Sequence, residues 1–237
     1  VAPLIEKKLS SLVLLVYGEA APMGSERQIE DDLLQALAQE AVQNQRYALA
    51  ARLSGKMRAP PPNMNEGEWV LRRSRIQIFA GQADDGLIAV VDWLSGIDQL
   101  SEEMLDRVMQ VFFDLQTIGR HALALKGFGQ VANFIQTPRQ RQELLFWMAE
   151  SHAALNEHVR SADLFLRSAA VDTRSATTLR WSQSARFKAA VQLTLAGLLT
   201  DARMIYLDLL QQAAARNQQL VLKQKIQDLG LRQAWSH

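Results

Sequence analysis

Apolar residues recur along most of this chain at spacings of three and four, which is the period of an amphipathic helix. In the segment 217–234, for example, Leu222, Ile226 and Leu229 form one apolar stripe. No alternation of period two is long enough to build a sheet. The pattern predicts an all-α chain with helices over 3–17, 26–43, 45–58, 66–80, 83–95, 101–117, 120–135, 138–155, 157–170, 176–196, 199–215 and 217–234.

A second, longer period overlies the helical one. Five small residues each follow a Gly or Asn by five or six positions, and they are spaced 36, 38, 38 and 40 residues apart. A signal that recurs at this period is typical of stacked helix pairs. The small residues are Ala50, Gly86, Ala124, Ala162 and Ala202, and the turn residues before them are Asn44, Gly81, Gly119, Asn156 and Gly197.

Proline and capping residues support these boundaries. The stretches 63–137 and 139–237 contain no proline, as long helical runs require. Several residues match the caps found at helix starts. They are Ser25 with Gln28, Asn63 with Glu66 or Asn65 with Glu68, Ser101, and Thr137 before Pro138. We expect one domain over 1–237. It comprises an N-terminal helix and loop (1–24), five helix pairs (25–215) and a capping helix (216–237).

The residues of the fourth pair resemble a known family, the tetratricopeptide repeat. Large and small residues follow its pattern at Phe146, Ala149, Glu150 and Ala153 in the first helix, and at Ala162, Leu166 and Ala169 in the second. The chain departs from the family in its pitch of 36–40 rather than 34 residues. Arg73 stands where an apolar residue is expected, and Phe112 and Glu150 where a small one is expected.

The resemblance implies a right-handed α-α superhelix that serves as a non-catalytic protein–protein interaction scaffold, within a larger bacterial protein or assembly. The alternative is the non-catalytic superhelical region of a larger enzyme, such as a cell-wall lytic enzyme, or of a signalling regulator. A further alternative, an RNA-binding repeat protein, needs a basic position that recurs in every repeat, and none recurs here. A nucleic-acid partner is therefore disfavoured.

The resemblance also implies which residues of each first helix face a concave groove. Such positions hold Lys, Asn and Arg in relatives that clamp a peptide carboxylate, whereas here they are mostly apolar. We therefore expect a groove for an apolar helix or an extended apolar segment, unless these side chains form the core instead. The positions are Gln35, Leu71, Met109, Trp147 and Phe187, followed by Gln39, Arg75, Phe113, Ser151 and Val191.

Charge divides unevenly along the chain. The net charge is +1, but residues 1–118 carry 11 Lys+Arg and 17 Asp+Glu, and residues 119–237 carry 15 and 8. A basic face in the second half would attract an acidic surface or the acidic half of another copy, unless it is a solvated helix face. Its members are Arg160, Arg167, Arg174, Arg180 and Arg186, with Lys188 beside them.

No group of residues predicts catalysis, a metal site or a cofactor site. The chain has no cysteine, which excludes thiolate chemistry. His152 and His158 lie near Glu150 and Glu157, but solvated turn histidines explain them better than a zinc site. The apolar run 9–17 is too short to span a bilayer, and we do not interpret it as a signal peptide. The compartment stays open, since cytoplasm and periplasm both fit.

Overall fold

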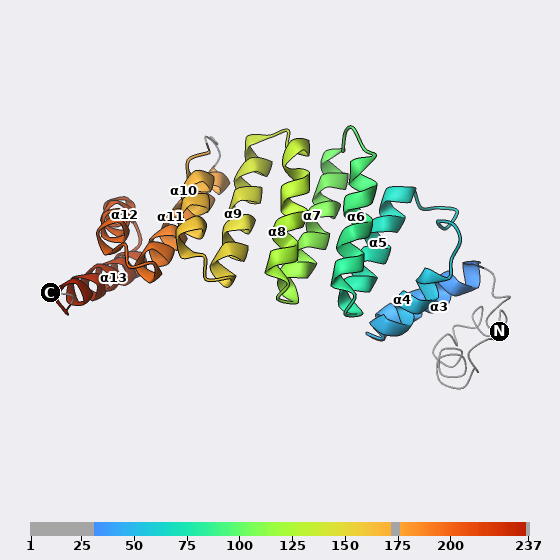
Figure 1. The fold of residues 1–237 in the computed structure, drawn as a ribbon. Helices are drawn as coiled ribbons and strands as arrows, with labels where there is room; N and C mark the ends of the chain where they lie inside the picture. The colour runs from blue at the N-terminus through green and yellow to red at the C-terminus, as the bar shows by residue number, and fades with distance from the viewer. Residues whose placement is uncertain (1–30, 172–175, 236–237) are drawn as a thin grey trace. The chain divides into compact units, whose positions relative to one another are not determined.

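The computed structural model describes residues 31–171 and 176–235, and all the regular structure in those ranges is helical (Figure 1). The predicted helix 3–17 and the Ser25–Gln28 capping box lie outside the described residues. The helices are α3 (Asp31–Gln43), α4 (Tyr47–Gly55), α5 (Glu66–Phe79), α6 (Ala83–Ser95), α7 (Glu102–Thr117), α8 (His121–Val131), α9 (Pro138–Ala154), α10 (His158–Ala169), α11 (Ala176–Leu195), α12 (Leu199–Gln212) and α13 (Arg216–Trp235).

The predicted turns are confirmed, with one shifted by a residue. Gly81, Gly119, Asn156 and Gly197 all have positive φ, between 60° and 86°. Such values favour glycine and are tolerated by asparagine. In the first turn it is Gln45, not Asn44, that has positive φ, at 57°. The Asn44 side chain instead donates hydrogen bonds to Glu40, to its carbonyl oxygen at 2.8 Å and to its carboxylate at 3.0 Å.

Three predicted helices are shorter than expected: 45–58 is observed as Tyr47–Gly55, 199–215 as Leu199–Gln212, and 120–135 ends at Val131. The segment 120–135 is not a single helix, because α8 ends at Val131 and a 3-10 turn, η1, follows over Ala132–Phe134. Ile135 is then extended, and so is Thr137, the residue that caps α9. The chain must leave the helix before Thr137, because an N-cap needs extended backbone.

The capping predictions are confirmed at three helix starts. Of the two alternatives for α5, Asn65 is the cap: its side chain accepts from Glu68 N at 2.8 Å, and Glu68 accepts in return from Asn65 N. Thr137 and Gln140 form the same reciprocal pair at α9, with Pro138 in the first turn. The Ser101 hydroxyl accepts from Met104 N at 3.2 Å. These caps satisfy amide groups that the helices leave open.

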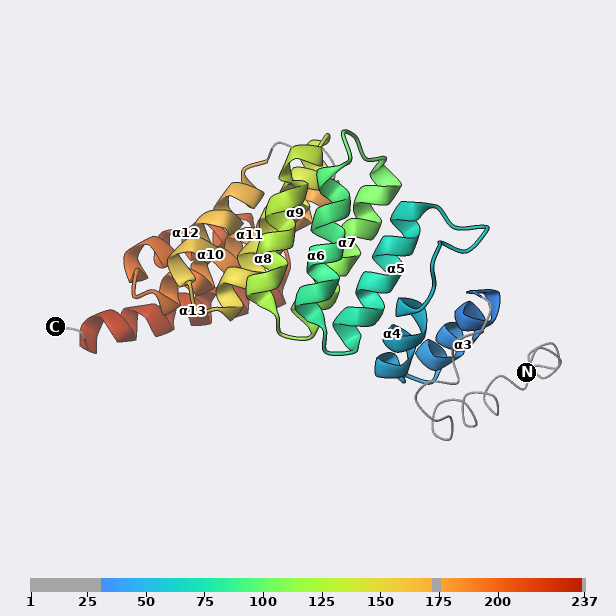
Figure 2. The same cartoon turned by 45° about the vertical axis from the view of Figure 1, so that its right-hand side comes forward.

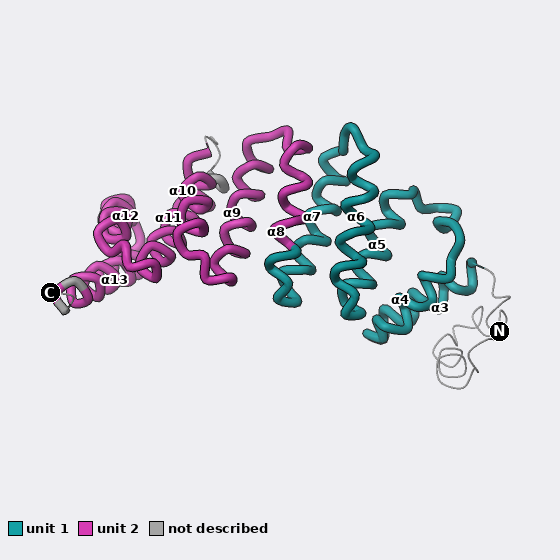
Figure 3. The backbone as a smooth tube through the Cα atoms, in the orientation of Figure 1, with its two compact units in different colours: residues 1–123 teal, residues 124–237 magenta. Residues whose placement is uncertain are grey.

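The chain divides into two compact units, residues 1–123 and 124–237, with the boundary inside α8 (Figure 3). In unit 1, Figures 1 and 2 both show α5, α6 and α7 side by side. Apolar side chains of α3, α4 and α5, among them Leu37, Leu53 and Trp69, form a core there. In unit 2, α10 to α13 share a core that includes Ala162, Tyr206 and Leu222.

The small residues that define the long period are all buried. Ala50, Ala124, Ala162 and Ala202 are at most 1% exposed, and Gly86 is buried on α6. Small side chains let neighbouring helices approach closely. Within the described residues, no helix is long and apolar enough to cross a membrane.

Candidate functional site

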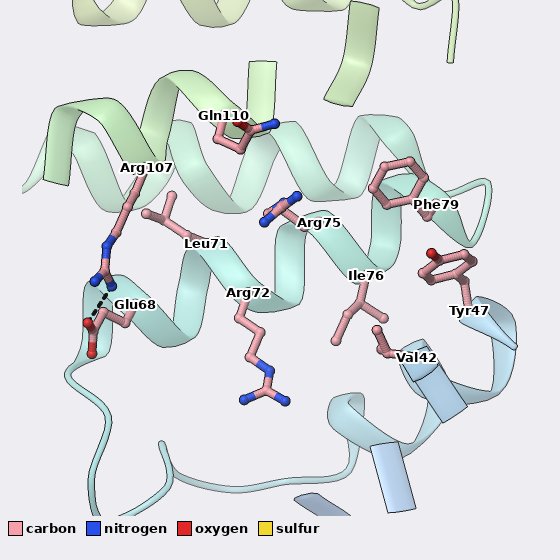
Figure 4. A pocket seen from close by; sticks show the side chains of 10 residues that line it. All are labelled: Val42, Tyr47, Glu68, Leu71, Arg72, Arg75, Ile76, Phe79, Arg107 and Gln110. Atoms are coloured by element: carbon pink, nitrogen blue, oxygen red, sulfur yellow. Dashed lines mark hydrogen bonds and ion pairs between the residues drawn. The ribbon is translucent and has the colours of Figure 1, made fainter. Parts of the chain in front are cut away.

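A groove of about 490 Å³ opens in unit 1, and one face of α5 forms its length (Figure 4). Its volume falls in the range typical of ligand sites. Neighbouring helices complete the walls: α3 and α4 on one side, α7 on the other. The lining residues are Val42, Tyr47, Glu68, Leu71, Arg72, Arg75, Ile76, Phe79, Arg107 and Gln110.

The α5 residues of the groove lie on one face because they recur at helical spacing. Glu68, Arg72, Arg75 and Phe79 follow one another at intervals of four, three and four, so they project from the same side of the helix. From Glu68 to Phe79 the helix rises about 16 Å. An extended segment of about five residues has the same length.

The end of the groove near Phe79 is aromatic and apolar. The rings of Tyr47 and Phe79 lie 5.2 Å apart and are tilted by 32°, so the first turn of α4 meets the last turn of α5. Both rings are half-buried, whereas Ile76, three residues before Phe79 on α5, is 6% exposed. Apolar side chains of a bound segment would find their contacts at this end of the groove.

The end near Glu68 is charged. Arg107, on α7, donates to Glu68 Oε1 at 2.5 Å and to Glu103 Oε1 at 2.7 Å. The hydrogen bond from Arg107 to Glu68, followed by that to Glu103, raises the pKa of the guanidinium above its ordinary value. Figure 4 shows Arg107 turned toward Glu68 across the groove. This arginine is therefore engaged by two carboxylates of the protein itself.

Arg75 is also engaged. Its Nε donates to Asp114 Oδ2 at 2.5 Å, and Gln110 Nε2 donates to Asp114 Oδ1 at 3.3 Å. The Asp114 side chain is 7% exposed while that of Arg75 is 47% exposed. A buried carboxylate needs such partners, so Arg75 offsets the charge of Asp114 while the exposed part of its side chain lines the groove.

Arg72 differs from both. It is half-buried, lines the groove, and has no ion pair or hydrogen bond from its guanidinium within the described chain. In Figure 4 its side chain extends away from α5, apart from the Arg107–Glu68 pair. The groove thus holds one arginine whose charge no carboxylate of the described residues offsets.

Of the residues predicted to face a partner, Leu71 and Arg75 line this groove. Met109 and Ser151 are buried, at 8% and 0% exposure, while Phe113, Trp147 and Phe187 are half-buried. In unit 2, Trp147 packs in an aromatic cluster with Phe146 and Trp181. Large apolar side chains at helical spacing do not by themselves reveal whether a face lies in the core or in a groove, and that ambiguity accounts for this outcome.

Phe187 lines a second groove, of about 520 Å³, between α11, α12 and α13. Leu209 and Leu222 contribute apolar side chains to it, and the exposed Arg180 lies at its rim. Among the predicted residues, Phe187 and Arg180 are therefore brought together here.

Most of the predicted basic face is paired with acids of unit 2. Arg160 lies 3.4 Å from Glu157 and Arg167 lies 3.6 Å from Asp163, while Arg186 contacts Asp208. Lys188 Nζ lies 2.6 Å from Glu150 Oε1, and Arg174 lies outside the described residues. Arg160, Arg167 and Arg186 are therefore paired, although pairing leaves the net charge of residues 119–237 unchanged.

The two turn histidines have separate partners. His152 Nδ1 lies 2.5 Å from Glu157 Oε2, and His158 Nδ1 lies 2.8 Å from Gln192 Oε1. The hydrogen bond from His152 lowers the pKa of Glu157, with Arg160 contributing in the same direction. In the described residues no three His, Asp or Glu side chains gather as metal ligands.

The sequence did not predict the other eight lining residues: Val42, Tyr47, Glu68, Arg72, Ile76, Phe79, Arg107 and Gln110. Glu68, Arg72 and Phe79 recur at helical spacing on α5, but nothing in the sequence marked that side of the helix as open. Comparison of the chain with protein-family models, with curated proteins and with solved structures finds no match.

Proposed function

We propose that this chain is a protein–protein interaction scaffold of the tetratricopeptide type, with about five helix pairs in a right-handed superhelix. It binds a peptide segment of a partner protein along the α5 groove. The observation that carries the proposal is the groove itself: it is about 16 Å long, apolar near Phe79 and charged near Glu68, open to solvent and walled by residues of four helices. The scaffold acts as a free protein or as a region of a larger one.

Polar contacts within each unit support the repeat. Arg75 pairs with Asp114 and Arg107 with Glu68, and both pairs are 39 residues apart. In unit 2, Gln142 donates to Ser182 Oγ at 3.0 Å, across 40 residues. These separations match the 36–40-residue pitch, as expected when first helices of consecutive pairs lie next to each other.

A rigid wall favours binding of an unstructured segment. Caps fix the start of α5, and the Arg75–Asp114 pair joins it to α7, so the groove does not have to form when a ligand arrives. Preorganisation lowers the entropic cost of association. A segment that lies in the groove would cover the exposed part of the Tyr47 and Phe79 rings.

The proposal is tested by selecting peptides from a random phage-displayed library on the immobilised full chain. Enriched peptides are then measured by fluorescence anisotropy against the wild type, against Phe79→Asp in the groove, and against Ile88→Asp. Ile88 is 55% exposed on α6 and lies outside the lining, so it is the matched control. Circular dichroism confirms that each variant is folded.

We expect peptides that bind the wild type and Ile88→Asp alike but lose at least about tenfold in affinity for Phe79→Asp. Enriched peptides that bind all three proteins equally would show that their binding site lies outside the α5 groove. A library that yields no specific binder would overturn the scaffold proposal.

A further inference from the structure

We infer that the segment held in the α5 groove carries an aspartate or glutamate side chain that pairs with Arg72, followed two positions later by a bulky apolar residue that lies on Ile76 and Phe79. This inference rests on the proposed function and adds the chemistry of the ligand. The partner is an acidic-apolar internal segment, not a chain terminus.

Three arginines line the groove, and they differ in whether a carboxylate of the protein pairs with them. Arg107 already has Glu68 and Glu103 within 2.7 Å, and Arg75 holds the buried Asp114 at 2.5 Å. The charge of each is therefore already offset by carboxylates of the protein, which weakens its attraction for another. Arg72 has none, so it is the groove's open site for a negative charge.

The surroundings of Arg72 strengthen a bond to a carboxylate. The side chain is half-buried beside Leu71 and Ile76, and an ion pair partly removed from water is stronger than one at an exposed surface. The Arg72 guanidinium can offer two parallel N–H groups to a carboxylate. A neutral amide side chain of the ligand in place of the carboxylate would gain only part of this interaction energy.

The spacing along α5 sets the order of residues in the ligand. Arg72 and Ile76 are one helical turn apart, which is about 6 Å along the helix, and Phe79 is about 10 Å from Arg72. In an extended segment, side chains two positions apart point the same way and are separated by about 6.6 Å. An acid at one position therefore places the residue two further on over Ile76, beside Phe79.

The charge of unit 1 indicates that this recognition is local. Residues 1–123 carry 12 Lys+Arg and 17 Asp+Glu, so the unit as a whole repels an acidic ligand. The attraction comes from one guanidinium and from apolar contact. A negatively charged segment without the apolar residue should then bind no better than a neutral one.

The probes are two pools of fluorescein-labelled heptapeptides, both with amidated C-termini. One pool has Asp followed two positions later by Leu, Ile, Phe or Tyr, in a neutral polar background, and the other has Asn in place of Asp. A third arm restores a free C-terminal carboxylate to the Asn pool. Anisotropy is measured with the full chain and with its variants Arg72→Gln, Arg72→Glu and Arg73→Gln.

Arg73→Gln is the matched control, because Arg73 is the next residue on α5, lies outside the lining and packs over the Trp69 ring at 5.6 Å. We expect the Asp pool to bind the wild type and Arg73→Gln about tenfold more tightly than the Asn pool does. Arg72→Gln should abolish that preference. Arg72→Glu should reverse it, so that the Asn pool binds more tightly than the Asp pool.

Equal binding of the Asp and Asn pools overturns the inference about the carboxylate, as does a preference that survives Arg72→Gln. A gain from the free C-terminus equal to that from Asp assigns the site to a chain end and overturns it as well. Binding of neither pool also overturns it. The peptide selection tests the scaffold proposal separately. If only the inference about the ligand fails, the selected peptides bind in the groove but lack an aspartate or glutamate.

Discussion

Two helix crossings, one in each unit, bring helices together by different means. Where α5 meets α6, a Cβ on Gly86 would lie 2.8 Å from the carbonyl oxygen of Ser74 and 2.9 Å from Ile78 Cγ1. Where α9 meets α10, two serines of α10 reach the α9 backbone. Ser161 donates to Ala149 O and Ser168 to Gln142 O, both at 2.8 Å.

The comparison separates two reasons for a small residue at a helix crossing. At the α5–α6 crossing the absence of a side chain lets the two backbones approach, and the contact is steric. At the α9–α10 crossing the helices lie close enough for two short serine side chains of α10 to donate hydrogen bonds to backbone carbonyls of α9. The long period in the sequence thus marks the close approach at Gly86, whereas the hydrogen bonds at the α9–α10 crossing come from Ser161 and Ser168, which lie outside the long-period positions. The following predictions test that distinction.

The largest effect is expected for Ala162→Leu. The substitution adds three heavy atoms to a site with no exposed space, and overpacking at such a site costs about 2–3 kcal/mol. Urea denaturation should show a lower free energy of unfolding. Val159→Leu is the control, since Val159 is 60% exposed on the same helix and the change there should stay within about 0.5 kcal/mol. An unchanged midpoint for Ala162→Leu would mean that α10 moves aside freely.

Gly86→Ala should destabilise less, by about 1–2 kcal/mol, because the gain in helix propensity offsets part of the clash with the Ser74 carbonyl. The matched control is Gly129→Ala on α8, where a Cβ would meet nothing within 4 Å. That variant should be more stable than wild type by about 0.5–1 kcal/mol. Thermal unfolding of both variants checks the sign. Stabilisation by both substitutions would remove the steric account of the α5–α6 crossing.

Ser168→Ala probes the hydrogen-bonded crossing. It removes the donor to Gln142 O in a fully buried site, and the expected loss is about 1 kcal/mol. Ser184→Ala, at an exposed position on α11, is the control and should be neutral. If Ser168→Ala is equally neutral in chemical denaturation, the serines at this crossing contribute only their small size.

The smallest effect concerns pH. The hydrogen bond from His152 lowers the pKa of Glu157 in the folded protein. This glutamate therefore adds stability that is complete above its unfolded pKa and is lost as pH falls through the lower, folded value. Wild type and Glu157→Gln should differ in unfolding midpoint near neutral pH and converge on acidification. A difference that grows as pH falls would contradict the sign.

Local chemistry made the fold largely predictable. Gly81, Gly119, Asn156 and Gly197 were recognisable as turns, because few residues other than glycine and asparagine adopt positive φ readily. The first turn was misplaced by one residue because Gln45 takes that conformation while Asn44 bonds back to Glu40. The early end of α8 was missed because its cause lies outside that helix: the cap of α9 at Thr137 needs extended backbone, so the chain has to leave α8 before it.

The site was less predictable. Leu71 and Arg75 were identified as groove residues and do line the groove, but Met109 and Ser151, chosen by the same rule, are buried. The rule places a residue on a helix face and does not say what covers that face. Tyr47 and Phe79 illustrate the same limit, because their contact depends on how α4 meets α5.

The sequence by itself determined most of the turns and helix caps, since those features depend on neighbours within a turn or two. Only the tertiary structure decided which charges cancel. Arg75 meets Asp114 and Arg107 meets Glu68 across 39 residues, while Arg72, in the same groove, meets no carboxylate within the described residues. Ion pairs form between side chains that packing brings within a few ångströms, and that proximity across 39 residues is set by how α5 and α7 pack.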